Sequence, residues 1–348
     1  MRVRAITTLL AAPIAVLALL AAPSAAAPPG VVPAKPTAPA PTAPAPAAPP
    51  GAPHSVCPAG AEVLANTAGA VAQRIYAGEV HSSATDSDKH QIESDGPLLS
   101  AMQSGDRAAI RAAVHRLVYS HTHIVRLRVS RGSELLDDEG GPYILAPVSG
   151  RLRLHGKEIG HFVFSVQDDL GYVKLVTRFI GAPLVLRTDA GNVPVGGLLS
   201  PGPASIPDRG PVDYRGVHYQ AYSFKAEAYP SGRLRASLLL PITSSLASKS
   251  CGEIETAELG LVAQRISRRF KLSPSAFPPY IRLVRTLTNA LVYVRAGSRT
   301  LAGSTHAAPA RLPAAGTLRF HGTNYGVFSF AAPASGGQVR VHVLVAAH

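Results

Sequence analysis

Cysteine is scarce in this sequence of 348 residues, which contains only Cys57 and Cys251. Neither lies in a Cys-x-x-Cys or histidine-rich pattern, so a cysteine-ligated metal centre is not expected. In an exported chain two such cysteines are expected to form one disulfide, and the alternative is a pair of free thiols. Because the bond would close a long loop, it would stabilise the fold by about 4–5 kcal/mol in the chain-entropy model.

Long apolar runs are also lacking, with one exception at the start of the chain. A basic tetrapeptide precedes the apolar residues 6–20, and Ala25-Ala26-Ala27 offers the small side chains that a signal peptidase requires. Residues 1–27 therefore predict a cleavable signal peptide and an extracellular protein, and the alternative is an uncleaved membrane anchor. Residues 28–56 are rich in proline and alanine, a composition typical of a semi-rigid linker.

The motifs of common hydrolases are missing as well. The sequence has no Gly-x-Ser-x-Gly elbow and no His-Glu-x-x-His pair, and no pair of carboxylates stands out for acid–base work. We therefore predict a protein that is not an enzyme and has no catalytic residues and no cofactor. A hydrolase of an unrecognised type is the alternative.

Acidic residues are few, because 21 Asp and Glu face 34 Lys and Arg for a formal net charge of +13. Such an excess attracts anionic polymers, phospholipid head groups or acidic metabolites. Nucleic acid is not an expected partner, since no aromatic-interleaved basic motif occurs. The alternative interpretation is that the arginines only keep the surface soluble.

The most regular feature of the sequence is a stretch that occurs three times, beginning at Gly150, Gly210 and Gly316. In each, a second glycine follows six residues on and an aromatic residue twelve residues on. Apolar residues alternate on both sides of the second glycine, which is typical of two strands joined by a tight hairpin. A third strand is expected to begin at Gly171, Gly232 and Gly337, so that each repeat forms an antiparallel meander.

A helical pattern occurs twice. Residues 69–75 and 260–266 agree at six of seven positions, and each follows a cysteine. The first helix is expected over residues 57–76, a loop over 79–93, short helices before 120 and an acidic loop over 137–142. The prediction is an α+β fold with three parts: a helix-plus-sheet domain at 57–187 with about five strands, a second sheet repeat at 188–245 and a third repeat at 246–348. The first and third parts would be two tandem subdomains.

Residues 127–141 and the hairpin Gly156-Lys157-Glu158-Ile159-Gly160 resemble the extracytoplasmic Cache (PAS-like, PDC-type) sensor domains. The resemblance covers residues 57–187 and, more faintly, 253–345. It implies a long helix on one face of the sheet and a small ligand on the other face under a loop. Because no transmembrane helix or signalling region follows, it implies a free sensor-like module.

The predicted ligand face of the first sheet is strongly basic. Its members are expected to be Arg126, Arg128, Arg153, His155, His161, Lys174 and Arg178, with Tyr143 as part of a lid. Guanidinium groups grip carboxylates and phosphates with two hydrogen bonds, so the expected ligand is a small anion. The alternatives are a solvated basic face, or a cell-envelope protein that binds anionic wall polymers.

Two further clusters could bind metals, although no metal site is predicted. Asp137, Asp138 and Glu139 are hard oxygen ligands, but they lack the alternate spacing of a calcium loop. His121 and His123, with His115 nearby, lack another ligand at the spacing of a zinc site. Asp168-Asp169 is expected to lie in a turn.

Overall fold

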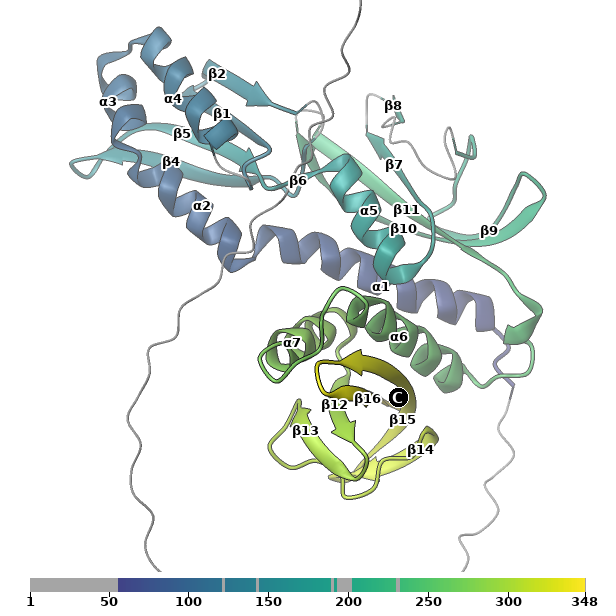
Figure 1. Ribbon diagram of the computed structural model, residues 1–348. Helices are drawn as coiled ribbons and strands as arrows, with labels where there is room; N and C mark the ends of the chain where they lie inside the picture. Colours follow the sequence, from purple (N-terminus) through teal and green to yellow (C-terminus); the bar gives the residue numbers. More distant parts are fainter. Residues whose placement is uncertain are drawn as a thin grey trace, which may run out of the picture. The chain divides into compact units, whose positions relative to one another are not determined.

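The structure is a computed structural model, and it describes residues 56–120, 123–141, 144–188, 191–192, 202–229 and 232–347 (Figure 1). The expected signal peptide and nearly all of the expected linker lie outside these residues, as does Tyr143. Within them, helices and antiparallel sheets alternate along the chain, so the α+β class expected from the sequence is confirmed.

Seven α-helices lie in the described residues. They are α1 (Gly60–Val80), α2 (Ser83–Ser94), α3 (Gly96–Ser104), α4 (Arg107–Ser120), α5 (Asp169–Ile180), α6 (Cys251–Ser267) and α7 (Phe277–Thr288). Asp106 caps the start of α4, because its Oδ1 accepts hydrogen bonds from the backbone N–H groups of Ala108 and Ala109. None of the described helices is long and apolar enough to cross a membrane.

Sheet A and sheet C are simple antiparallel sheets. Sheet A has the order β2-β1-β5-β4 and consists of β1 (Arg126–Arg131), β2 (Glu134–Gly140), β4 (Val148–Leu154) and β5 (Lys157–Ser165). Sheet C has the order β13-β12-β16-β15-β14 and consists of β12 (Leu291–Ala296), β13 (Arg299–Gly303), β14 (Ala315–Phe320), β15 (Thr323–Ala334) and β16 (Gly337–Ala346).

Sheet B has the order β6-β3-β10-β11-β7-β8, and β9 pairs with β10. Its strands are β3 (Ile144–Leu145), β6 (Gln167–Asp168), β7 (Leu184–Thr188), β8 (Gly191–Asn192), β9 (Arg209–Tyr214), β10 (Val217–Tyr229) and β11 (Gly232–Pro241). Five of these strands run β8-β7-β11-β10-β9, which is the order of sheet C.

The helices repeat in the same way as the sheets. α1 packs on β10 and β11, and α6 packs on β15 and β16. Tyr172 in α5 donates to the carbonyl of Ala72 in α1 at 2.9 Å, and Tyr280 in α7 donates to the equivalent Ala263 in α6 at 3.1 Å. We call α1, α5 and β7–β11 copy 1, and α6, α7 and β12–β16 copy 2 (Figure 1).

An inserted unit separates α1 from the rest of copy 1. It comprises α2, α3, α4 and sheet A, and its apolar side chains form a core of their own around Phe162, Phe164 and Leu127. The two copies instead share one large core, which contains α1, α5, α6, α7 and the inner faces of sheets B and C. The expected boundary between residues 187 and 188 falls inside β7.

The repeated glycines form the hairpins that the sequence predicts. His155-Gly156, Arg215-Gly216 and His321-Gly322 all have positive φ, between 46° and 81°. This is the geometry of the two-residue turn that suits twisted strands, and glycine occupies its second position without strain. The meanders that begin at Gly210 and Gly316 are confirmed as β9-β10-β11 and β14-β15-β16.

The first meander is incomplete, so the expected third strand at Gly171 is wrong. Asp168 caps a helix there by accepting from the backbone of Gly171, and α5 buries Tyr172 and Val176 at helical spacing. In sheet A, β5 therefore pairs directly with β1, and sheet A has four strands instead of five. The two aspartates expected in a turn, Asp168 and Asp169, start this helix instead.

Two predicted loops are also regular structure. α2 occupies most of residues 79–93. The Ser82 side chain caps the start of α2 by accepting a hydrogen bond from the backbone N–H of Thr85. Residues 137–140 of the expected acidic loop 137–142 belong to β2, where they pair with β1. Both stretches are mostly polar, and a polar surface helix or edge strand resembles a loop in composition.

The expected disulfide is present between Cys57 and Cys251, with 4.8 Å between their Cα atoms. Cys57 lies just before α1 and Cys251 begins α6, so the bond joins equivalent ends of the repeated helices. The structure thus links copy 1 to copy 2 covalently at the point where α1 and α6 begin.

Candidate functional site

Three of the predicted ligand residues lie on one face of sheet A. Arg126, Arg128 and Ser130 occupy every second position of β1 and so share one face of the sheet. His161 in β5 is the cross-strand partner of Ser130 and lies on the same face. Leu127, Val129 and their neighbours point to the opposite face and into the core under α3 and α4. The division of sheet A into an apolar and a basic face is as the alternation of the sequence indicates.

Arg126 is already bound by a carboxylate. Its Nε donates to Asp138 Oδ1 at 2.5 Å and its Nη2 donates to Oδ2 at 2.8 Å, and both side chains are mostly buried. Arg128 is the cross-strand neighbour of the same Asp138. The acidic residues of β2 thus balance the basic residues of β1, which weakens the middle of this face as an anion site.

The possible metal ligands are also engaged in side-chain pairs. His115 Nδ1 lies 2.7 Å from Glu139 Oε1, and His123 Nδ1 lies 3.9 Å from Asp88 Oδ2. In the part of the chain that the structure describes, no three His, Cys, Asp or Glu side chains are grouped to hold a metal ion.

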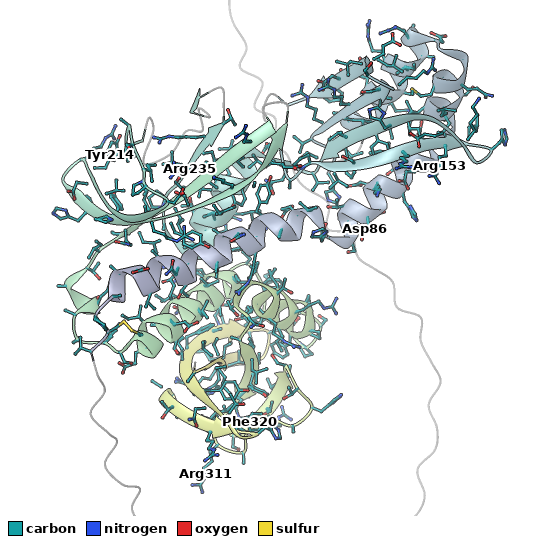
Figure 2. The ribbon with its side chains drawn as sticks, turned by 180° about the vertical axis from the view of Figure 1, so that it is seen from behind. Asp86, Arg153, Tyr214, Arg235, Arg311 and Phe320 are labelled. Carbon is teal, nitrogen blue, oxygen red and sulfur yellow. A yellow bond between two sulfur atoms is a disulfide. The ribbon has the colours of Figure 1, made fainter. Side chains whose placement is uncertain are left out.

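The remaining predicted residues are dispersed. Lys174 and Arg178 are exposed on α5, which packs with the copies and not with sheet A. Their predicted place on the basic face is wrong because residues 169–180 are helical. Arg153 is exposed on β4 in the inserted unit (Figure 2), and His155 is at the tip of the β4–β5 hairpin.

A groove of about 680 Å³ lies at this hairpin. His155 and His161 line it together with Arg131 and Lys157, and Met102, Leu154 and Ile159 supply apolar walls. We call it the hairpin groove. It contains two residues of the predicted site, one from the hairpin tip and one from β5.

The hairpin groove is basic. Glu158 is the one carboxylate in its lining, and Arg151 already lies 3.4 Å from it. Arg131 donates to the carbonyl of Met102 and so is fixed at the end of α3. Lys157 is exposed and has no ion-pair partner among the described residues. An anion in this groove would meet two permanent cations and two imidazoles.

Sequence reasoning missed Arg131 and Lys157. Both belong to hairpins: Arg131 ends β1 at the tight turn to β2, and Lys157 follows the turn at Gly156. Alternation along a strand assigns side chains to faces, but it does not show which hairpin ends lie together. The Gly-Lys-x-Ile-Gly motif contained the signal, since four of its five residues line the groove.

A pair of arginines was missed in sheet B. Arg187 and Arg235 are cross-strand neighbours, and Arg235 Nη2 lies 2.8 Å from Asp208 Oδ1. Burial and the nearby charge of Arg235 lower the pKa of Arg187. Arg187 donates to the carbonyl of Pro203 and Arg235 to that of Ile206, so this pair fastens residues 203–208 over the outer face of sheet B.

α6 carries a buried acid. Glu258 is only 6% exposed, and its Oε1 has no hydrogen-bond partner among the described residues, with Arg265 Nη1 3.8 Å away. Burial raises its pKa to about 7, against the opposing effect of Arg265. Glu258 lines a cavity of about 220 Å³ that also contains Lys249 and Arg265.

No protein-family model matches the sequence, and no curated protein matches it. Two solved structures show partial similarity. The ligand-binding domain of the Pseudomonas fluorescens chemoreceptor CtaA, solved with L-alanine, aligns over 49% of this chain and 92% of its own, at 10% identity and a TM-score of 0.29. The ligand-binding domain of the Pseudomonas aeruginosa PAO1 amino acid chemoreceptor PctC, solved with GABA, aligns over 48% and 99%, at 14% identity and a TM-score of 0.24.

Both solved structures are ligand-binding domains of chemoreceptors. The α+β class of this chain follows from its own helices and strand orders.

Proposed function

We propose that this protein is an exported, non-enzymatic, sensor-like module that binds a small carboxylate or phosphate in the hairpin groove. One observation carries the proposal: the groove combines Arg131, Lys157 and two histidines with a single carboxylate that is already paired. Its volume of about 680 Å³ lies within the roughly 300–1,000 Å³ of ligand pockets in general.

The walls of the groove suit a ligand with one charged end. Met102, Leu154 and Ile159 offer apolar surface, while Lys157 and the imidazoles offer hydrogen-bond donors.

The test is calorimetric titration of the folded chain with succinate and citrate. The Lys157→Ala/His161→Ala variant should lose at least tenfold in affinity for whichever of these two carboxylates binds. Arg153→Ala is the matched control, because Arg153 is an exposed cation of the same hairpin that does not line the groove. Absence of binding, or equal loss in both variants, would contradict the proposal.

A second candidate function is adhesion to anionic polymers of the cell envelope. The observation that favours it is the formal net charge of +13. Sedimentation with cell walls over a salt series distinguishes the two, because binding by net charge weakens steeply with ionic strength. Such binding should depend on the number of cations removed and not on whether they line the groove.

A further inference from the structure

The chain contains no Asp or Glu after Glu258, although that segment forms most of copy 2. Basic residues continue through it: Arg265, Arg268, Arg269, Lys271, Arg282, Arg285, Arg295, Arg299, Arg311, Arg319 and Arg340. No carboxylate side chain from within this segment can neutralise them. Arg265 lies 3.8 Å from Glu258 in α6, but the part of copy 2 that follows α6 has no Asp or Glu side chain of its own to pair with its arginines.

A second groove lies in this acid-free segment. It has a volume of about 560 Å³ and lies where the end of α7 meets β12 and β13. Pro278, Ile281, Ala290, Leu291 and Ala302 supply its apolar surface, and its polar side chains are Arg282, Arg285, Thr286, Asn289 and Ser304. The lining contains two cations and no carboxylate. We call it the α7 groove.

The arginine side chains of the α7 groove make few hydrogen bonds within the protein. Arg282 is exposed and has no hydrogen bond or ion pair with any described residue, while Arg285 makes one hydrogen bond, to the carbonyl of Ser304 at 3.4 Å. Ser304 Oγ accepts from the backbone of Val292 at 2.7 Å, which leaves its own O–H free to donate. Two guanidinium groups three residues apart on one helix face can therefore meet a common ligand.

We propose that the α7 groove binds an oxyanion, with a phosphate group as the best match, between Arg282 and Arg285. A phosphate offers several oxygens to donors from different directions, whereas a carboxylate offers two in one plane. The groove is lined by two guanidinium groups, the Asn289 amide and the hydroxyl groups of Thr286 and Ser304. This number of donors suits a phosphate, which has more acceptor oxygens than a carboxylate.

The end of α7 opposes an anion, because a helix carries about −0.5 elementary charge at its C-terminus. Two full positive charges outweigh it. Asn289 also reduces this effect, since its left-handed conformation lets its backbone N–H bond the carbonyl of Arg285 at 2.8 Å.

The phosphate group can come from two sources, a free anion or a lipid head group at a surface. The test measures binding of the folded chain to inorganic phosphate by calorimetry, and to phosphatidylglycerol and phosphatidylcholine vesicles by sedimentation. Arg282→Ala/Arg285→Ala should reduce phosphate binding at least tenfold. Binding to phosphatidylglycerol vesicles alone, lost in the same variant, would identify the head group as the source and would also support the proposal.

Arg311→Ala/Arg319→Ala is the matched control. Both arginines are exposed in copy 2 and lie outside the groove lining, and Figure 2 shows Arg311 projecting away from the fold. This variant removes the same charge and should leave binding unchanged. Equal loss in the two variants, or no binding by the unaltered chain to either probe, would overturn the proposal. Lys157→Ala/His161→Ala tests the hairpin groove separately and should not affect phosphate binding here.

Discussion

Arg74 in α1 and Arg265 in α6 make the same contact in the two copies. Arg74 Nη1 donates to the carbonyl of Leu287 in the last turn of α7 at 3.0 Å, and Arg265 Nη1 donates to the carbonyl of Ile180 in the last turn of α5 at 2.5 Å. Each long helix therefore satisfies a free carbonyl at the end of the short helix in the other copy. The two copies are joined by reciprocal hydrogen bonds as well as by the disulfide.

The hydrogen bonds of Arg74 and Arg265 predict that removing either side chain lowers the free energy of unfolding, and that the two variants differ in how this loss depends on pH. Arg74→Met and Arg265→Met should each lower the free energy of unfolding by about 1–3 kcal/mol, because a buried carbonyl loses a charged donor. Arg265→Met should cost more at pH 8 than at pH 5, since Arg265 also faces Glu258. Urea unfolding at both pH values measures this. Equal costs for both variants at pH 8 would contradict the role of Arg265 beside Glu258.

The repeated glycine of the helices predicts a second pair of effects. A Cβ at Gly69 would lie 2.1 Å from the ring of Tyr222, and one at Gly260 would lie 2.2 Å from the ring of Phe328. Gly69→Ala and Gly260→Ala should therefore each destabilise the fold by about 1–3 kcal/mol through overpacking.

Gly78→Ala in α1 is the control for both glycines. A Cβ at Gly78 would meet nothing within 4 Å, so alanine should stabilise the helix by about 0.5–1 kcal/mol. Thermal unfolding of the three variants tests the idea. Stabilisation by Gly69→Ala would show that α1 does not pack against Tyr222 as closely as described.

The repeated part of the fold could be predicted because turn geometry and close packing require glycine and aromatic residues at fixed positions. The hairpin turns require glycine at residues 156, 216 and 322. The ring of Tyr222 packs against Gly69 in α1, and the ring of Phe328 packs against Gly260 in α6. α5 could not be predicted in the same way. Gly171-Tyr172-Val173-Lys174 has the same glycine, apolar and basic positions as the strands that begin at Gly232 and Gly337, although Asp168 caps a helix there.

The candidate site was predictable in chemistry but not in position. A basic face on β1 and β5 follows from alternation, and His161 is on it. Its partial neutralisation by Asp138 does not follow from the sequence, because the expected acidic loop over residues 137–142 has no register with β1, whereas in the structure Asp138 pairs with Arg128 across β1 and β2. The hairpin groove depends on tertiary packing of α3 against the β4–β5 hairpin, which no local pattern encodes.

The disulfide should contribute strongly to stability. It joins residues 194 positions apart, and in the chain-entropy model a loop of that length raises the free energy of unfolding by about 5 kcal/mol. Cys57→Ser/Cys251→Ser should therefore unfold at a much lower urea concentration than the oxidised chain. Reduction of the unaltered chain with dithiothreitol should match the variant. An unchanged midpoint in both would indicate that the thiols are not bonded in solution.

Glu258 should make stability depend on pH. Its pKa is about 7 in the fold and near 4.5 in the unfolded chain, so the folded protein holds the proton more tightly. The contribution is fully present below pH 4.5 and is lost as the pH rises through about 7. The shift corresponds to about 3 kcal/mol as an order of magnitude.

Glu258→Gln keeps the size of the side chain and removes the charge. At pH 8 it should be more stable than the unaltered chain by about 1–3 kcal/mol, because no buried carboxylate must then be desolvated. At pH 4 the two should be nearly equal, since Glu258 is protonated in both the folded and the unfolded chain. Urea unfolding between pH 4 and pH 8 measures the difference. A constant difference over this range would mean that the carboxyl of Glu258 is solvated and titrates as it does in the unfolded chain.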